Sequence, residues 1–157
     1  MGTAANQSGT FAASEFQFAI VAARYNSDIV EALLEAARAT WRKHGGTDAA
    51  LRVEHVPGAF ELPLAARALA LHGGVDAVVA LGCVIRGDTA HFELVAGQCA
   101  YGLQRVMLDT GVPVSFGVLT VDTRAQALER AAADSLNKGA EALDTALAMA
   151  SLLRRLK

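Results

Sequence analysis

Residues 75–85 are apolar at almost every position, and this run limits the possible folds more than any other part of the chain. A strand with apolar side chains on both faces is typical of the middle of a parallel sheet that has helices above and below it. The run is far too short to cross a bilayer, which takes about 20 apolar residues. It therefore predicts a buried strand, and no membrane partner is expected.

Three more apolar runs predict strands, and residues with helical spacing separate them. We expect these strands at residues 16–24, 51–56 and 112–121. We expect helices from Asn26 or Ser27 to Gly45, from Pro57 to Gly73, from Gly87 to Gly111, over residues 125–135, and onward from Asn137. Strands that alternate with helices imply right-handed crossovers, hence a parallel sheet between two layers of helices. The predicted class is α/β, a three-layer α/β/α sandwich.

Length, charge and cysteine content narrow the functional classes. A chain of 157 residues fits one domain, which we place at residues 16–157, after a loose polar tail at residues 1–15. The net charge of −2, with scattered Lys and Arg, predicts no nucleic-acid partner. Cys83 and Cys99 have the spacing of neither a metal site nor a disulfide framework, which suits a reducing compartment. Because the tail lacks a signal-peptide pattern, we expect a cytoplasmic protein.

The hydrophobic content of 53% is high for a small domain. Extra apolar surface indicates subunit interfaces. A sequence rich in alanine can reach the same content without exposing an apolar patch. Composition alone leaves both interpretations open.

The carboxyl ends of the predicted strands are where a ligand is expected, because open parallel sheets bind ligands there. Tyr25 and Phe60 place aromatic rings at two of these ends, and Ala59 and Glu61 lie beside Phe60. Two rings suit a planar heterocycle. Taken singly, each ring is more often a packing residue, and Glu61 can be a simple first-turn charge that complements the helix dipole.

The turn after residues 75–85 has the residues of an anion site. We expect the first free N–H groups of the next helix near Gly87, Asp88 and Thr89, and such a terminus attracts phosphate. Asp88 is equally suited to a plain helix cap, which is the favoured interpretation of the residues alone. His91, predicted one turn into the helix, can exchange protons with a substrate, but it can also be a surface or packed histidine.

Two cations near the end of the chain also suit an anion. Lys138 stands at the predicted start of the last helix, where a positive charge is mildly unfavourable, so something anionic should offset it. A nearby acid can do this, and so can a bound phosphate. Arg130, on the preceding helix, can supply a bidentate grip. The alternative is that both are solvated cations in weak surface pairs.

Six motifs, taken in order, resemble those of the lumazine synthase family, and the likeness extends from about Phe16 to Leu156. They are Arg24-Tyr25-Asn26, Pro57-Gly58-Ala59-Phe60-Glu61, the run GCVIRGDTAH at residues 82–91, Phe116-Gly117-Val118-Leu119-Thr120, Glu129-Arg130-Ala131 and Asn137-Lys138-Gly139. The resemblance implies a four-stranded parallel, flavodoxin-like sheet. Tyr25 replaces the usual Phe or Trp, and Asp88 occupies a position that is often small and neutral in relatives.

The resemblance also implies a reaction and a role for each matching residue. The family condenses 5-amino-6-(D-ribitylamino)uracil with 3,4-dihydroxy-2-butanone 4-phosphate in riboflavin biosynthesis, without a metal or organic cofactor. By this likeness His91 would transfer protons. The pyrimidine and ribityl chain would contact Tyr25, Ala59, Phe60, Glu61, Cys83, Val84, Ile85, Phe116 and Lys138. The phosphate would be bound by Gly87, Asp88, Thr89 and Arg130.

The family resemblance further implies assembly. Phe116 would come from a neighbouring subunit, so a pentamer is the minimum expectation. The short turn at Asn137-Lys138-Gly139 resembles members that build icosahedral shells of about sixty chains, and riboflavin synthase is a conceivable partner. The N-terminal segment would pair with a neighbour's sheet. Two rival interpretations are a noncatalytic flavin- or phosphate-binding module on the same fold and a structural shell protein.

Overall fold

The computed structural model describes residues 12–134 and 136–157, and its centre is a four-stranded parallel sheet. The strands are β1 (Phe18–Ala23), β2 (Leu51–Val56), β3 (Ala77–Ile85) and β4 (Val114–Val121), in the order β2-β1-β3-β4. The two middle strands, β1 and β3, are the most apolar and the most completely buried. The predicted parallel sheet is therefore confirmed, with β2 at its predicted bounds and the other strands slightly shorter than predicted.

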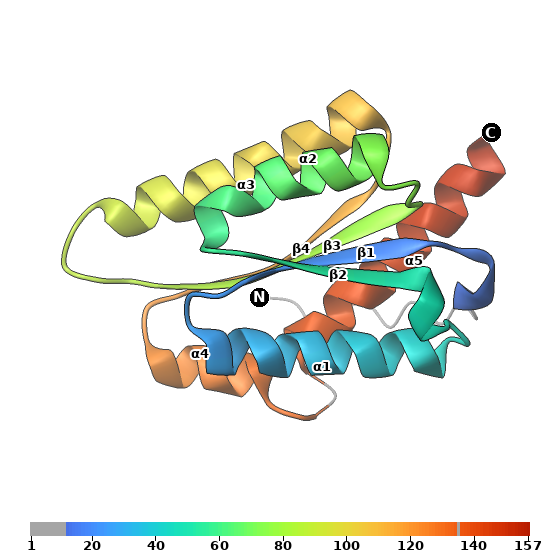
Figure 1. Cartoon of the computed structure of the whole chain (residues 1–157). Helices are drawn as coiled ribbons and strands as arrows, with labels where there is room; N and C mark the ends of the chain where they lie inside the picture. Colours follow the sequence, from blue (N-terminus) through green and yellow to red (C-terminus); the bar gives the residue numbers. More distant parts are fainter. Residues whose placement is uncertain (1–11, 135) are drawn as a thin grey trace.

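Helices cover both faces of the sheet (Figure 1). Helices α2 (Leu62–His72) and α3 (His91–Thr110) lie on one face, and α1 (Ser27–Lys43), α4 (Arg124–Ala131) and α5 (Lys138–Leu156) lie on the other. This is the expected three-layer, flavodoxin-like arrangement. Within the part of the chain that the structure describes, no helix combines the length and the apolar character needed to cross a membrane.

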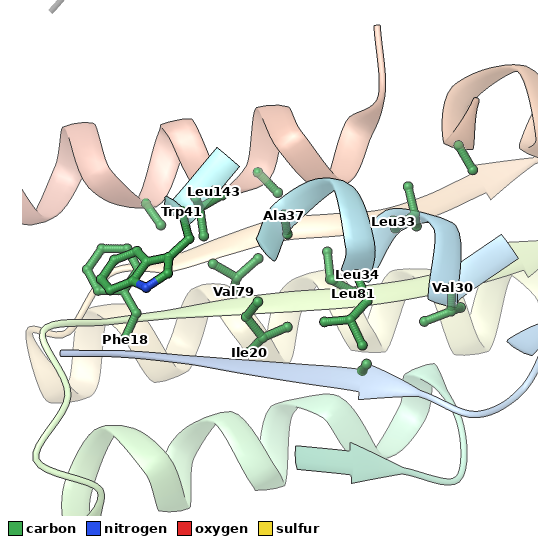
Figure 2. Close-up of a cluster of buried hydrophobic side chains, with 14 of the residues drawn as sticks. Phe18, Ile20, Val30, Leu33, Leu34, Ala37, Trp41, Val79, Leu81 and Leu143 are labelled. Atoms are coloured by element: carbon green, nitrogen blue, oxygen red, sulfur yellow. The ribbon is translucent and has the colours of Figure 1, made fainter. Parts of the chain in front are cut away.

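Each face of the sheet has its own apolar core. On the α1 and α5 side, the fully buried Trp41 packs against Phe18, with ring centroids 4.9 Å apart, and its indole N–H donates to the Thr47 carbonyl at 2.9 Å. Figure 2 shows the α1 side chains directed onto β1 and β3. On the other face, α2 and α3 pack Leu62 and Leu103 against the sheet. The sheet therefore holds its carboxyl edge between two packed layers.

Glycines follow the ends of α1, α2 and α3 as predicted, and α4 is shorter than predicted. Gly45 follows α1 with φ +86°, and Gly111 follows α3 with φ +71°, a left-handed conformation that glycine adopts without strain. Helix α4 ends at Ala131 rather than near residue 135. The cause is Asn137, whose amide donates to the Ala131 carbonyl at 2.8 Å while its Oδ1 accepts from the Gly139 N–H at 2.8 Å. One side chain thus ends α4 and begins α5.

The end of the predicted tail packs against the domain. Residues Ala13–Glu15 form a 3-10 turn, in which Ala13 is fully buried and donates its N–H to the His44 carbonyl at 2.9 Å. Glu15 forms an ion pair with Arg154 of α5 at 2.9 Å. The rest of the tail, residues 1–11, lies outside the described residues. The expected pairing of the segment at residues 11–16 with a neighbour's sheet stays a prediction.

Candidate active site

A cavity of about 1080 Å³ lies at the carboxyl ends of β1, β2 and β3 and runs along the first two turns of α3. Such a volume accommodates a small-molecule ligand. The residues that line it are Tyr25, Asn26, Pro57, Gly58, Ala59, Phe60, Glu61, Cys83, Val84, Ile85, Gly87, Thr89, His91, Phe92, Leu94, Val95 and Gln98. Most of the predicted site residues are among them. Four are not: Phe116, Asp88, Arg130 and Lys138.

The two predicted rings are exposed at the cavity. Tyr25 is 74% exposed and Phe60 is 58% exposed, although both are large and have apolar rings. A packing residue of the chain's own core would be buried, so the packing interpretation does not hold for either ring within one chain. Their exposure leaves two flat faces available to a ligand or to another subunit.

Hydrogen bonds join the three strand ends that form the cavity. The Arg24 N–H donates to the Val56 carbonyl at 2.8 Å, which ties β1 to β2. Asn26 donates its side-chain amide to the Cys83 carbonyl at 2.9 Å, which ties β1 to β3. Asn26 stands at the start of α1 as predicted, but its side chain makes no capping bond there and its backbone is left-handed, with φ 56°. The side-chain amide of Asn26 instead holds the end of β3, which forms part of the cavity wall.

Glu61 has a local partner in the turn after β2. Its Oε2 accepts from the Gly58 N–H at 2.9 Å and so closes the 3-10 turn Ala59–Glu61. Phe60 projects outward from the same turn while Ala59 is buried. The carboxylate therefore supports the turn and also faces the cavity, where its second oxygen is not used by this bond.

The turn after β3 differs from the prediction at the helix start. Helix α3 begins at His91 rather than directly after Gly87, so His91 is its first residue and not one turn inside. The position before it is Ala90, which has no capping side chain, so Asp88 is not the cap. Thr89 Oγ1 accepts from the His91 N–H at a long 3.4 Å. His91 is exposed and lines the cavity together with Gly87 and Thr89.

Three predicted site residues lie away from the cavity of their own chain. Phe116, on β4, pairs in register with Ala80 of β3 and is 46% exposed. Arg130 donates to the Gln126 carbonyl at 3.0 Å and lies 3.8 Å from the Glu129 carboxylate. Lys138 forms an ion pair with Glu141. A nearby acid thus offsets Lys138, which was the simpler of the two alternatives.

The thiols of the two cysteines favour their protonated form, which is the unreactive one. Both are buried, and burial raises the pKa of the Cys83 and Cys99 thiols to about 11. Cys83 therefore contributes a neutral, weakly polar patch to the cavity wall. Among the residues that the structure describes, no group of His, Cys, Asp and Glu side chains is arranged to hold a metal ion.

Some lining residues were not predicted. Leu94, Val95 and Gln98 follow His91 at steps of three, four and seven, which places all four on one face of α3. That spacing is present in the sequence, but spacing alone does not show that this face of the helix meets a cavity.

A family model described as 6,7-dimethyl-8-ribityllumazine synthase matches residues 15–154, which is nearly the whole chain.

Proposed function

The chain belongs to the 6,7-dimethyl-8-ribityllumazine synthase family, and from this premise we propose that it condenses 5-amino-6-(D-ribitylamino)uracil with 3,4-dihydroxy-2-butanone 4-phosphate. Membership implies a transferase-type enzyme of riboflavin biosynthesis, with small-molecule substrates and an oligomeric assembly. The proposed products are 6,7-dimethyl-8-(D-ribityl)lumazine, phosphate and water.

The observation that carries this proposal is the cavity, which is lined both by the exposed rings of Tyr25 and Phe60 and by His91. A pyrimidine can stack on Tyr25 or Phe60, and its ribityl hydroxyls can bond to Glu61 and nearby backbone groups. The backbone of Val84 and Ile85 lies at the end of β3, where it can meet the ring edge. Holding two reactants together is itself worth up to about 7–11 kcal/mol in well-oriented cases.

In this proposal His91 moves the protons. The first substrate's amine attacks the ketone carbonyl and water leaves to form a Schiff base. A proton is then removed from the carbon chain as phosphate leaves, and the resulting enol tautomerises to a second carbonyl. The second nitrogen attacks that carbonyl, and a second water leaves as the ring closes. Each step needs a group that gains and loses a proton near neutral pH, as imidazole does. His91 stands at the start of α3, within the cavity where these atoms would lie.

The phosphate has two proposed contacts. Gly87 and Thr89 offer the turn before α3, and Arg130 offers a guanidinium. Asp88 does not line the cavity, so its carboxylate need not face the phosphate. A site shared between subunits accounts for the positions of Phe116, Arg130 and Lys138, none of which lines the cavity of its own chain. We therefore also propose a pentamer or a multiple of pentamers, whose size light scattering would measure.

The test is to mix purified protein with the two substrates and to follow the fluorescent lumazine. We expect formation well above the uncatalysed rate. His91→Ala should lower kcat by about 10²- to 10⁴-fold, the usual share of general acid–base catalysis. His72→Ala is the matched control, because His72 is exposed at the end of α2 and does not line the cavity.

Two results would contradict the proposal. Product formation no faster than without enzyme would favour the flavin- or phosphate-binding module or the structural shell. Full activity in the His91→Ala variant would remove His91 from the chemistry while leaving the reaction itself in place.

A further inference from the structure

Arg86 follows β3 directly, yet its side chain does not line the cavity. Its Nε donates to Asp122 Oδ1 at 2.8 Å, and its Nη1 donates to the Glu93 carboxylate. The guanidinium also lies over the Phe92 ring, 4.1 Å from the centroid. Three contacts from one planar group fix its orientation, which a flexible lysine could not do.

These contacts join three elements beside the cavity. Asp122 comes directly after β4, whereas Phe92 and Glu93 are the second and third residues of α3. The Arg86 backbone N–H continues the sheet by donating to the Val121 carbonyl at 2.9 Å. The side chain of Arg86 therefore holds the start of α3 against the end of the sheet.

The start of α3 lacks the usual local support. Ala90, the residue before the helix, has no side-chain oxygen to accept a backbone N–H. A missing cap normally leaves the first turn free to fray. Arg86 offsets this from outside the helix, since it grips the two residues that follow His91.

The pairing keeps both groups charged. The hydrogen bond from Arg86 lowers the pKa of Glu93 below its usual value, and the bonds to Glu93 and Asp122 raise the pKa of Arg86. The side chain of Arg86 is 43% exposed, and exposed ion pairs contribute little to stability. The Arg86 side chain should therefore affect the position of the first turn of α3 more than the free energy of unfolding.

We infer that Arg86 is a positioning residue that sets His91 at the cavity. The inference rests on the proposed function for the reaction, but the geometry of His91 can be tested without it. The competing role is a phosphate ligand, which would need a guanidinium directed into the cavity. The donors of Arg86 are directed instead to Asp122 and Glu93.

The experiment compares the steady-state kinetics of Arg86→Ala and Arg86→Lys with those of Arg105→Ala. Arg105 is also exposed and paired, but its carboxylate partner, Asp109, lies on the same helix α3. We expect Arg86→Ala to lower kcat about 10- to 100-fold, as a small misplacement of a reacting group does. KM for each substrate should change little, Arg86→Lys should not rescue kcat, and Arg105→Ala should match the parent.

The double variant Arg86→Ala/His91→Ala separates positioning from a general structural defect. If Arg86 acts through His91, the double variant should be no slower than His91→Ala alone. A further loss of the same size as in the single variant would overturn the inference. So would a parent-like kcat in Arg86→Ala, or an increase confined to KM for the phosphate substrate, which would assign Arg86 as a ligand.

A second readout does not depend on catalysis. The NMR titration of the His91 imidazole should differ between the parent and Arg86→Ala, and should be unchanged in Arg105→Ala. If the parent forms no lumazine but this difference is found, the proposed reaction fails and the positioning role stands. If the titration is the same in all three proteins, the positioning role fails.

Discussion

Two titratable side chains that line the cavity, those of Glu61 and Cys83, interact mainly with their own chain. Glu61 accepts from the backbone of its own turn, and Cys83 keeps its proton because burial raises its pKa to about 11. Among the described residues that line the cavity, His91 is the one histidine, and imidazole is the side chain most often used for proton transfer near neutral pH. This supports His91 as the group that exchanges protons with a substrate.

The thiols give a prediction at the scale of the residue. Since burial raises the pKa of Cys83 and Cys99 to about 11, the native thiolate fraction at pH 8 should be lower than in unfolded protein by about 100-fold. We expect a thiol reagent to label the native protein at least that much more slowly than the protein in urea. A Cys99→Ala variant isolates Cys83, and rapid labelling of that variant at pH 8 would contradict the prediction.

The raised pKa of the two thiols also makes the free energy of unfolding depend on pH. A folded-state pKa above the unfolded value means that the folded protein favours the protonated thiol. This contribution to stability is complete below about pH 9 and is lost between about pH 9 and pH 11, because the unfolded chain deprotonates first. Replacing both cysteines with alanine should flatten this part of the stability curve.

Single residues also limit what the sequence alone can predict of the site. Tyr25, Phe60 and His91 could be predicted because each follows the end of a strand within six residues. Arg86 was part of a recognised motif, but its partner Asp122 is remote in sequence and meets it only because β3 and β4 pair in register to their ends. A contact of that kind depends on the pairing of strands, which the motif does not contain.

At the scale of elements, α1 and α5 pack closely against each other at Gly139. A Cβ on Gly139, in the first turn of α5, would lie 2.0 Å from the Leu33 carbonyl oxygen of α1. This atom belongs to the backbone, so the helices themselves would have to separate. The glycine therefore sets how closely α5 approaches α1.

Gly139→Ala should accordingly destabilise the fold by about 1–3 kcal/mol or more, the usual cost of overpacking. Gly97→Ala is the matched control, since Gly97 lies within α3 and a Cβ there would meet nothing within 4 Å. That change should be neutral or should stabilise by up to about 1 kcal/mol through helix propensity. Thermal unfolding at one fixed protein concentration measures both. Equal melting temperatures for the two variants would refute the close approach.

The bounds of helices and strands show where the sequence pattern was sufficient to predict the start and the end of an element. Strand β2 matches its prediction because an alternating pattern begins and ends sharply at residues 51–56. Helix α3 was expected to begin near Gly87, because Asp88 is a good cap by residue type, but it begins at His91, and Arg86 contacts its first turn from outside the helix. Helix α4 was expected to reach residue 135, but the side chain of Asn137, which precedes α5, bonds to the Ala131 carbonyl, and the helix ends there. Both differences involve a side chain from outside the helix.

For the whole molecule, the composition left two explanations for the high apolar content. One is apolar surface that is buried between subunits, and the other is a high content of alanine. Large apolar side chains are exposed on the outer helices, including Leu64 at 75% and Leu108 at 73%. Alanine does not account for these. Together with the exposed rings of Tyr25, Phe60 and Phe116, they favour burial against other subunits, as expected in a family of oligomeric enzymes.

A shared site makes a prediction that only mixed oligomers can test. Arg130→Ala should strongly impair use of the phosphate substrate, and His91→Ala should slow proton transfer. If the cavity of one chain is completed by Arg130 of another, oligomers assembled from equal amounts of both variants should have both residues intact at about a quarter of their sites. Coexpression with two different tags would isolate such hybrids, and we expect their activity to exceed that of either parent. Activity equal to the mean of the two parents would place Arg130 and His91 in the site of one chain, because every chain of the hybrid lacks one of the two residues.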